Sequence, residues 1–228
     1  ENYFNKSRDL QDYDRLCHYE LKPLLKMLAK KSLTQGRALR IFDSGCGDGF
    51  ALLDAEKNYK SLSFAGLTYR METFMHFEIS RFVNVDLIVD NFIEDLSAAE
   101  ILGQKPKFSL ILDIFGPYSY SPRIIDVINK YLSMLEPEGE IFIVSSACDR
   151  RFNRERGLAV VFEDNRFIDV SRWLLINGLN LEILKDKDLE FIKIKAKGSK
   201  ALKPLALDYT YPYLYPPARD FKWRAAKL

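Results

Sequence analysis

The sequence predicts an α/β fold in which a mostly parallel β-sheet has helices on both faces. From Ala38 onward, short apolar segments typical of strands alternate with segments typical of helices. One of them, Phe108 to Ile114, is mostly apolar, as in a strand buried on both faces. A third observation is the turn after the first strand, where glycine occupies every second position, Gly45, Gly47 and Gly49. A strand, a glycine turn and a helix in this order are typical of small-molecule sites.

The composition restricts the class of protein. The 228 residues suit one α/β domain with an appendage, or at most two small domains. A hydrophobic fraction of 47% is ordinary for a globular chain, and a net charge of +2 creates no strong field that would favour nucleic acid or a membrane. Cys17, Cys46 and Cys148 match neither a disulfide framework nor zinc-ligand spacing. Without a signal peptide or a long apolar run, we expect a cytoplasmic protein with no membrane insertion.

Residues 1 to 36 are expected to form a helical cap ahead of the sheet. Apolar residues recur at helical spacing between Leu16 and Leu28, and Pro23 predicts a break or a helix start near Leu21. An amphipathic helix packed on the sheet explains this pattern. Candidate pocket residues in the same segment are Tyr3, Phe4 and Tyr13.

The first strand, expected at Ala38 to Phe42, leads into the glycine turn. Glycine permits positive φ and a close approach of a ligand to the backbone, and the free amides of the next helix favour an electron-rich group. The spacing Asp43-x-Gly45-x-Gly47-x-Gly49 differs from the dinucleotide pattern G-x-G-x-x-G, which argues against an NAD-dependent dehydrogenase. It resembles the first motif, D-x-G-x-G-x-G, of the class I S-adenosylmethionine (SAM) dependent methyltransferases. A tight glycine turn in an unrelated α/β protein is the alternative.

This resemblance implies a role for each residue of the turn. In the family, the glycines let the turn lie against the methionine part and the ribose of SAM, and the acid at the strand end orients the amino group of the cofactor. The corresponding cofactor-binding residues of this chain are Asp43, Ser44, Gly45, Cys46, Gly47 and Gly49.

The chain departs from the family where the second strand, Ser61 to Thr68, ends. The family usually has an acidic residue there, which bonds both ribose hydroxyls. Here the position belongs to Thr68, followed by Tyr69. A hydroxyl makes one bond where a carboxylate would accept two stronger ones. Either a neighbour such as Glu72 substitutes for the acid, or SAM binds more weakly, or the cofactor differs.

The third strand, Val85 to Val89, is expected after a helix from about Met71 to Phe82. The following Asp90-Asn91-Phe92 resembles the third cofactor motif of the family. The resemblance implies that Asp90 and Asn91 bind the adenine amino group while Phe92 covers the ring. An Asp at the end of a strand is otherwise a common turn former.

The fourth strand, Phe108 to Ile114, contains an acid near its end. A carboxylate in such an apolar run is buried only for a reason, and ligands bind at the carboxyl ends of strands. In the family this end faces the methyl group of SAM, which implies that Asp113 binds the acceptor or takes a proton from it. Bonding of a loop amide is the alternative. The next residues, Phe115-Gly116-Pro117-Tyr118, lack the Asn or Asp that base and amide N-methyltransferases usually have, and leave Tyr118 to contact the acceptor.

The remaining elements complete the order that the family requires. A helix is expected from Ser121 to about Leu135, then a turn resembling L-K-P-G-G, a fifth strand at Ile141 to Ser145, and a helix at about Arg166 to Asn177. The last two strands are expected at 179–184 and 189–197. The resemblance therefore implies a Rossmann-like, seven-stranded, mostly parallel sheet that ends in an antiparallel hairpin. Residues 37–197 would form the SAM-binding domain, and residues 198–228 an extended aromatic strap.

These observations predict an enzyme that transfers a methyl group from SAM to an oxygen or nitrogen atom of a small molecule or a protein side chain. The alternative is a catalytically inactive methyltransferase-fold protein that binds or regulates a partner, which Thr68 and the aromatic tail favour. The arginines between 150 and 156 keep a nucleic-acid acceptor among the candidates, but the low net charge does not favour it. No metal is required, and the sequence leaves the oligomeric state open.

Overall fold

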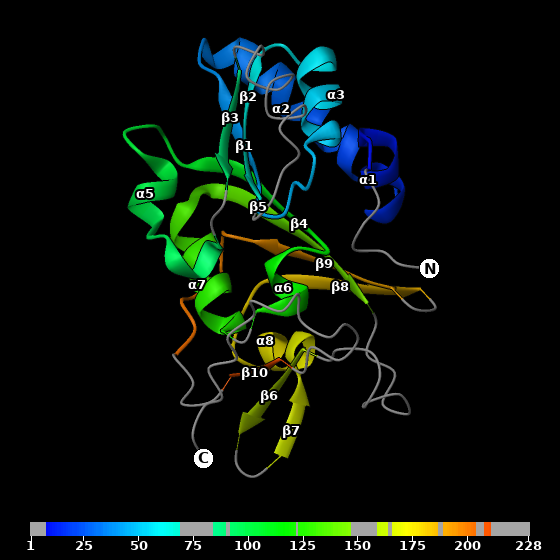
Figure 1. The fold of residues 1–228 in the computed structure, drawn as a ribbon, viewed down its shortest axis with the longest axis vertical. Coiled ribbons are helices and arrows are strands. Elements are labelled where there is room, and N and C mark those ends of the chain that lie inside the picture. Colours follow the sequence, from blue (N-terminus) through cyan, green and yellow to red (C-terminus); the bar gives the residue numbers. More distant parts are fainter. Residues whose placement is uncertain are drawn as a thin grey trace.

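A seven-stranded sheet forms the centre of the computed structural model, which describes residues 8–68, 84–89, 92–121, 123–146, 159–163, 166–186, 189–203 and 208–210 (Figure 1). The strand order is β3-β2-β1-β4-β5-β9-β8. The first five strands pair in parallel, while β9 is antiparallel to both β5 and β8. This arrangement confirms the predicted fold class. The strands are β1 (Leu39–Asp43), β2 (Leu62–Thr68), β3 (Val85–Val89), β4 (Phe108–Ile114), β5 (Leu135–Ser146), β8 (Leu181–Asp186) and β9 (Leu189–Lys195).

Helices cover both faces of the sheet, because successive strand residues point to opposite sides. Ile41 and Leu112 belong to one hydrophobic cluster, together with residues of α1 (Leu10–Leu16), α2 (Leu21–Gln35) and α3 (Phe50–Asn58). Phe42 and Ile111 belong to a second cluster on the other face, together with residues of α5 (Ala98–Leu102), α6 (Pro117–Tyr120), α7 (Ile124–Met134) and α8 (Val170–Ile176). A short 3₁₀ helix, η2 (Ile93–Asp95), precedes α5. None of the described helices is both long and apolar enough to cross a bilayer.

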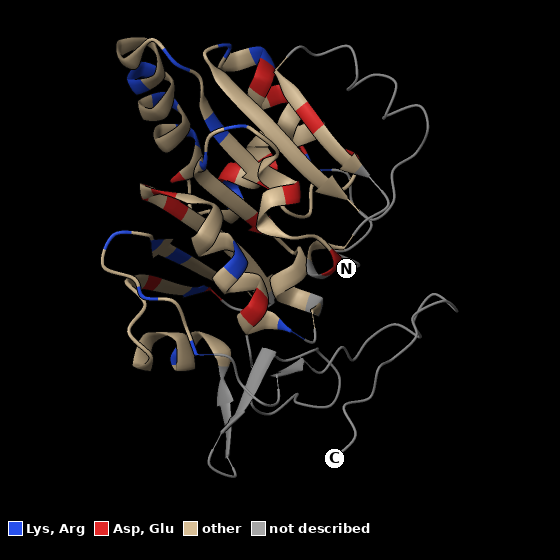
Figure 2. Cartoon of the chain, turned by 90° about the vertical axis from the view of Figure 1, so that its left-hand side faces the viewer, with Lys and Arg blue, Asp and Glu red and all other residues tan. Residues whose placement is uncertain are grey.

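Charged residues of both signs are interspersed over the described part of the chain (Figure 2). The longest run of one sign in a helix is in α2, where four lysines occur without an acidic residue, Lys22, Lys26, Lys30 and Lys31. Within the part of the chain that the structure describes, the charges of both signs agree with the small net charge and form no basic field of the kind that attracts nucleic acid.

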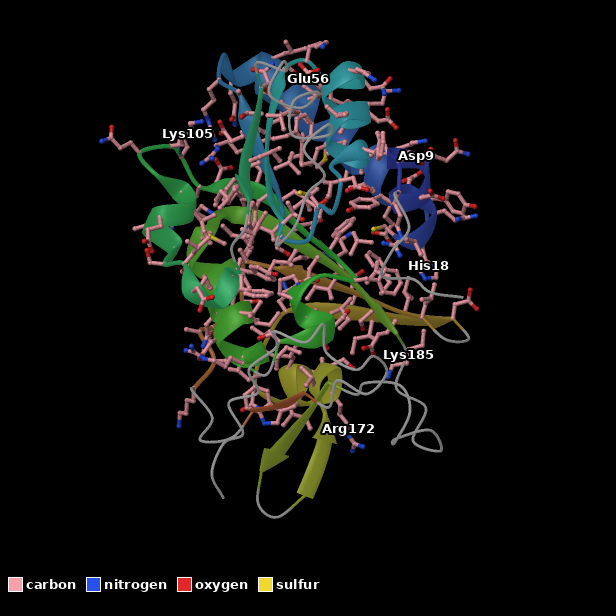
Figure 3. The ribbon with its side chains drawn as sticks, in the orientation of Figure 1. Asp9, His18, Glu56, Lys105, Arg172 and Lys185 are labelled. Atoms are coloured by element: carbon pink, nitrogen blue, oxygen red, sulfur yellow. The ribbon has the colours of Figure 1, made fainter. Side chains whose placement is uncertain are left out.

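The predicted break in the N-terminal helical segment is confirmed, and it separates α1 from α2. Asp9 caps α1 by accepting a hydrogen bond from the amide of Asp12 at 2.8 Å, and both Asp9 and His18 lie at the ends of this short helix (Figure 3). His18 and Tyr19 then adopt positive φ angles of 52° and 63°. The carboxylate of Asp14 accepts from the amide of Lys22 in the first turn of α2 at 2.8 Å.

Two predicted boundaries differ from the structure. Helix α7 begins at Ile124 rather than at Ser121, because the hydroxyl of Ser121 accepts from the amide of Arg123 and ends the preceding turn. The turn predicted before the fifth strand lies inside β5, as an irregularity between the pairs Phe108–Leu135 and Leu110–Glu140. Gly139 is needed there, since a Cβ at this position would lie 3.1 Å from the carbonyl oxygen of Phe108.

A second, three-stranded sheet was not predicted. It has the order β10-β6-β7, with β6 (Ala159–Glu163) antiparallel to β7 (Arg166–Asp169) and to β10 (Asp208–Thr210). The helix expected from Arg166 is therefore wrong over its first four residues, and α8 begins at Val170. The β-branched and aromatic residues on either side of positions 164–165 favour strands, but Asp-Asn is not one of the residue pairs that most strongly mark a hairpin turn.

Candidate cofactor and active site

The glycine turn lies at the carboxyl edge of the sheet, between the ends of β2 and β4. The amide of Ser44 donates to the carbonyl of Leu112 in β4 at 2.9 Å, and the amide of Cys46 donates to the carbonyl of Leu67 in β2 at 3.0 Å. These two bonds extend the parallel pairing of β1 with its neighbours into the turn. The backbone of the turn is thus held on both sides.

Two glycines of the turn have conformations that other residues rarely adopt. Gly47 and Gly49 have φ angles of 52° and 76°, and Gly49 is the N-cap residue directly before α3. A Cβ at Gly47 would meet no heavy atom within 4 Å, so its backbone borders open space. This is the arrangement expected of a turn that lets a ligand approach the main chain.

The third glycine of the turn, Gly45, permits a close crossing of two backbones. A Cβ at Gly45 would lie 2.8 Å from the Cα of Gly116, in the loop that follows β4. A Cβ at Gly116 would in turn lie 2.7 Å from Oδ1 of Asp113. Contacts this short do not occur with real side chains, so both positions require glycine as the loops lie here. The predicted cofactor turn and the predicted acceptor loop are therefore in direct contact.

Asp43 is the last residue of β1 and is completely buried. Its Oδ2 accepts a hydrogen bond from the hydroxyl of Tyr13 at 2.8 Å, and its Oδ1 accepts from the amide of Gly45 at 3.1 Å. Burial raises the pKa of Asp43 to about 6, although these two bonds and Arg8 act in the opposite direction. The pKa of Tyr13 is raised by burial and by Asp43, so its hydroxyl is a neutral donor.

The contact between Tyr13 and Asp43 brings α1 onto the predicted site. A second contact comes from Arg8, whose guanidinium lies 4.8 Å from the ring centre of Phe115. Phe115 directly follows β4 and has a positive φ of 55°, which is rare for an aromatic residue. The sequence marks Tyr13 only as a candidate pocket residue, because the residue that it bonds lies 30 positions further along the chain.

Asp113 is completely buried and holds the loop that follows β4. Its Oδ2 accepts from the hydroxyl of Tyr131 at 2.7 Å and from the amide of Tyr118 at 2.9 Å. Its Oδ1 has no hydrogen-bond partner in the described part of the chain. Burial raises the pKa of Asp113 to about 7, and the nearby Asp43 also acts to raise it, whereas the hydroxyl of Tyr131 and the amides of Tyr118 and Gly116 act to lower it. The bond to the Tyr118 amide is the loop-ordering role named above as the alternative to chemistry.

The side chain of Tyr118 also lies in the core, with 1% of its surface exposed. Neither Asp113 nor Tyr118 presents an open face to solvent in this arrangement. Their assignment as residues that act on an acceptor stays a prediction.

Tyr131 is the residue of this site that the sequence did not reveal. It lies on α7, among residues that pack on the sheet, and its hydroxyl bonds both Asp113 and the hydroxyl of Ser44, the latter at 2.6 Å. Helical periodicity identifies Tyr131 as a core residue, but nothing local in the sequence indicates partners that lie 18 and 87 positions away.

The strand register brings the other predicted cofactor residues to the same edge. Asp43 pairs with Gly66 of β2, and Thr68 at the end of β2 pairs with Val89 at the end of β3. Thr68 is buried, and Phe92 is half-buried just before η2. Lys130 of α7 holds that segment by donating to the carbonyls of Ile93 and Leu96. The remaining predicted residues, Tyr69, Asp90 and Asn91, lie outside the described residues, as do the predicted helix from Met71 and the four arginines at 150–156.

Among the described residues, no group of three or more His, Cys, Asp or Glu side chains is placed to hold a metal ion.

Comparison with known proteins shows similarity in structure but not in sequence. No protein-family model and no curated protein matches the chain. The CMeT domain of the citrinin polyketide synthase matches with a TM-score of 0.51 and 13% identity, over 72% of this chain and 48% of that one. A putative SAM-dependent methyltransferase from Listeria monocytogenes matches with a TM-score of 0.49, 15% identity and coverage of 73% and 94%. The N-methyltransferase NodS from Bradyrhizobium japonicum matches with a TM-score of 0.46, 15% identity and coverage of 77% and 96%.

The strand order and the antiparallel β9 are those that the family resemblance implied, and the CMeT domain, with a TM-score of 0.51, shares this arrangement. The chain therefore has the Rossmann-like fold of the class I SAM-dependent methyltransferases. At 13 to 15% identity the likeness concerns the fold alone.

Proposed function

We propose that this protein is a SAM-dependent methyltransferase that acts on an oxygen or nitrogen atom of a small molecule or of a protein side chain. The observation that supports this most is the glycine turn at the carboxyl edge of β1. Gly47 and Gly49 are in left-handed conformations, the backbone at Gly47 borders open space, and a buried acid, Asp43, lies directly before the turn. These features fit a cofactor that has a cationic amino group and that lies along the backbone.

In this proposal each predicted residue keeps the role implied by the family resemblance. Asp43 holds the amino group, and its pKa of about 6 leaves it mostly ionised at neutral pH. Ser44, Gly45, Cys46, Gly47 and Gly49 form the backbone surface. Thr68 and Tyr69 would contact the ribose, and Asp90, Asn91 and Phe92 the adenine. When bound, SAM supplies a methyl group that is already activated on a sulfonium.

The loop after β4 would form the acceptor side of the site. Asp113 orders this loop through the amide of Tyr118. Because both side chains are buried, a role for Asp113 as a base would require the loop to open. The mixed surface charge favours a small molecule or a protein side chain over nucleic acid as the acceptor. The buried free thiols of Cys17 and Cys46 suit a reducing compartment such as the cytoplasm.

Thermal unfolding with and without ligand tests the proposal. We expect SAM and S-adenosylhomocysteine, at about 100 times their Kd, to add about 2.7 kcal/mol, which raises the Tm by roughly 5 to 11 °C, while NAD gives no shift. Asp43→Asn should abolish the shift, whereas Asp54→Asn, on the neighbouring helix α3, should keep it. Absence of any shift with millimolar SAM would contradict the proposal.

A binding or regulatory protein without catalysis is the second candidate, favoured by Thr68 at the position of the usual ribose-binding acid. A Thr68→Glu or Thr68→Asp variant distinguishes the two. If the site has lost function through this residue, the acid should restore a thermal shift that the natural chain lacks. If the natural chain already binds SAM, incubation with methyl-labelled SAM and a panel of acceptors then shows whether a methyl group is transferred.

A further inference from the structure

We propose that Tyr131, together with Asp113 held as a neutral carboxylic acid, is a positioning residue that locks the glycine turn to the end of β4. This inference deepens the proposed function, because Ser44 at the start of the turn is one of the proposed cofactor-binding residues. The lock is a property of the folded chain, so it can be tested without any ligand.

Three buried oxygen–oxygen contacts in a row form the lock. Oδ2 of Asp113 lies 2.7 Å from the hydroxyl of Tyr131, which lies 2.6 Å from Oγ of Ser44. Oγ of Ser44 lies 3.0 Å from the carbonyl oxygen of Leu112. The exposed fraction is at most 1% for Asp113, Tyr131 and Ser44, so the protein itself has to satisfy these groups.

The number of protons in this row indicates the ionisation state of Asp113. The three contacts need three protons, and the hydroxyls of Tyr131 and Ser44 supply only two. A proton on Oδ2 of Asp113 supplies the third. Asp113 then donates to Tyr131, Tyr131 donates to Ser44, and Ser44 donates to the carbonyl of Leu112. Loss of the proton from Asp113 leaves one of these short contacts between two acceptors.

The charged surroundings favour the same state. Asp43 on β1 opposes a second negative charge at Asp113, and no described Lys or Arg forms an ion pair with Asp113. From α6 the group that faces Asp113 is the amide of Tyr118, and from α7 it is the hydroxyl of Tyr131. Arg8 and Tyr13 act on Asp43 instead. The two neighbouring acids therefore differ in role, since Asp43 is placed to be ionised and Asp113 to stay neutral.

The consequence concerns the position of the turn. The amide and the hydroxyl of Ser44 both donate to the carbonyl of Leu112. The hydroxyl of Tyr131, on α7, donates to the hydroxyl of Ser44. The next residue, Gly45, lies against Gly116 with no room for a side chain. When Asp113 ionises, the row loses a bond, and the turn loses the fixed position against which a cofactor would bind.

The ligand-free test is an NMR titration of the aspartate carboxyl carbons, with the Asp113 resonance assigned by its disappearance in Asp113→Asn. We expect Asp113 to titrate near pH 7, more than two pH units above an ordinary aspartate, and to titrate at a different pH in Tyr131→Phe, because the Tyr131 hydroxyl is a hydrogen-bond partner of Asp113 in both ionisation states. Tyr19→Phe, at an exposed tyrosine, should leave the titration unchanged. An Asp113 that titrates near pH 4, or a titration that Tyr131→Phe does not move, would overturn the proposal.

The ligand-dependent test is calorimetric binding of S-adenosylhomocysteine between pH 6.5 and 9. We expect Tyr131→Phe to weaken binding about tenfold at pH 6.5, the order expected for one lost buried hydrogen bond, while Tyr19→Phe binds as the natural chain does. The natural chain should bind more weakly as the pH rises, and Asp113→Asn should lose this dependence. Equal affinities for Tyr131→Phe and the natural chain would refute the positioning role. If the ligand binds to no form of the chain, the proposed function fails, and the carboxyl titration alone decides on the lock.

Discussion

At the scale of single residues, two buried acids at the ends of adjacent parallel strands have surroundings that favour opposite ionisation states. Asp43 is bonded by a tyrosine hydroxyl and a backbone amide, and a cation at Arg8 favours its ionised form. Asp113 lies in a row of hydroxyls that needs an extra proton. Unlike environments at neighbouring acids are a common way for proteins to separate pKa values within one site.

The glycines give a prediction that separates backbone strain from ligand contact. Gly47 and Gly178 both have positive φ and no heavy atom near a hypothetical Cβ, but only Gly47 lies in the turn. We expect Gly47→Ala and Gly178→Ala to lower the free energy of unfolding by a similar amount, about 1 kcal/mol. Only Gly47→Ala should weaken S-adenosylhomocysteine binding in calorimetry. Equal ligand affinities in the two variants would remove Gly47 from the site.

Gly45→Ala tests the backbone crossing itself. Its Cβ would lie 2.8 Å from the Cα of Gly116, and a backbone atom cannot rotate away as a side chain can. We expect a loss of about 1 to 3 kcal/mol, the usual cost of overpacking, measured by urea denaturation. Because φ at Gly45 is not positive, a loss as small as that of Gly178→Ala would mean that the two loops separate easily.

The residues of the turn were predictable from the sequence and Tyr131 was not, for one physical reason. The glycine pattern is local, since the strand, the turn and the helix are consecutive. The partners of Tyr131 and Tyr13 are brought to them by the parallel strands, and a single sequence does not display such distant pairs. Cys46 and Gly66 are another pair that is distant in sequence and close in space, because a Cβ at Gly66 would lie 2.7 Å from the thiol of Cys46.

At the scale of elements, α1 is the segment that contacts the proposed cofactor site from outside the sheet. It is joined to α2 through two consecutive residues in the left-handed region, His18 and Tyr19, and it contacts the site through Tyr13. The sequence indicated a helical cap with a break near Leu21, because Pro23 and the apolar spacing are local signals. It did not indicate that the cap bonds the acid of the glycine turn.

Tyr13→Phe tests this coupling. The hydroxyl of Tyr13 lowers the pKa of Asp43, so its loss should raise that pKa above about 6 and leave less carboxylate near neutral pH. We expect Tyr13→Phe to bind S-adenosylhomocysteine more weakly than the natural chain, by a larger factor at pH 6.5 than at pH 7.5, as measured by calorimetry. Tyr59→Phe, at the end of α3, is the matched control. A loss that is the same at both pH values would show that Tyr13 acts by packing alone.

The unpredicted elements have causes at this same scale. The sequence predicts a helix over residues 166–169 because the helical pattern of α8 directly follows them. Four residues are too few to show the alternation of side chains that is typical of a strand. The pairing of β6 with β10 joins residues about 50 positions apart, and such contacts depend on the whole fold rather than on local preference.

At the scale of the whole molecule, the strand order explains why these groups meet. The five parallel strands place the carboxyl ends of β1, β2, β3 and β4 at one edge, and β1 lies between β2 and β4. The two hydrophobic clusters cover the two faces of the sheet, and the proposed site lies at this edge. Four motifs in the correct order were enough to predict this architecture, because α/β topologies with right-handed crossovers are few.

The two acids should make the stability of the whole molecule depend on pH. Each has a pKa that folding raises, so its stabilising contribution is fully present below about pH 4 and is lost as the pH rises through about 6 for Asp43 and about 7 for Asp113. We expect the free energy of unfolding in urea to fall between pH 4 and pH 8, by on the order of 4 kcal/mol from Asp113 alone.

Variants identify the source of this fall. Asp113→Asn should remove the larger share of the fall, including the part above about pH 6, and Asp43→Asn should remove a smaller share that ends near pH 6. Asp54→Asn on α3 should reproduce the natural curve. A curve that stays level from pH 4 to pH 8 in the natural chain would show that both carboxyls ionise freely after folding.

The crossing of Gly45 and Gly116 also constrains how this sequence can diverge. A side chain at Gly45 would meet the backbone of Gly116, whereas a side chain at Gly116 would first meet Oδ1 of Asp113, so Gly45 depends on the loop after β4 and Gly116 depends on Asp113. In an alignment of descendants of this chain, lineages that lose Gly45 should therefore also change the loop after β4, although the two segments lie 71 positions apart, and lineages that lose Gly116 should also change Asp113.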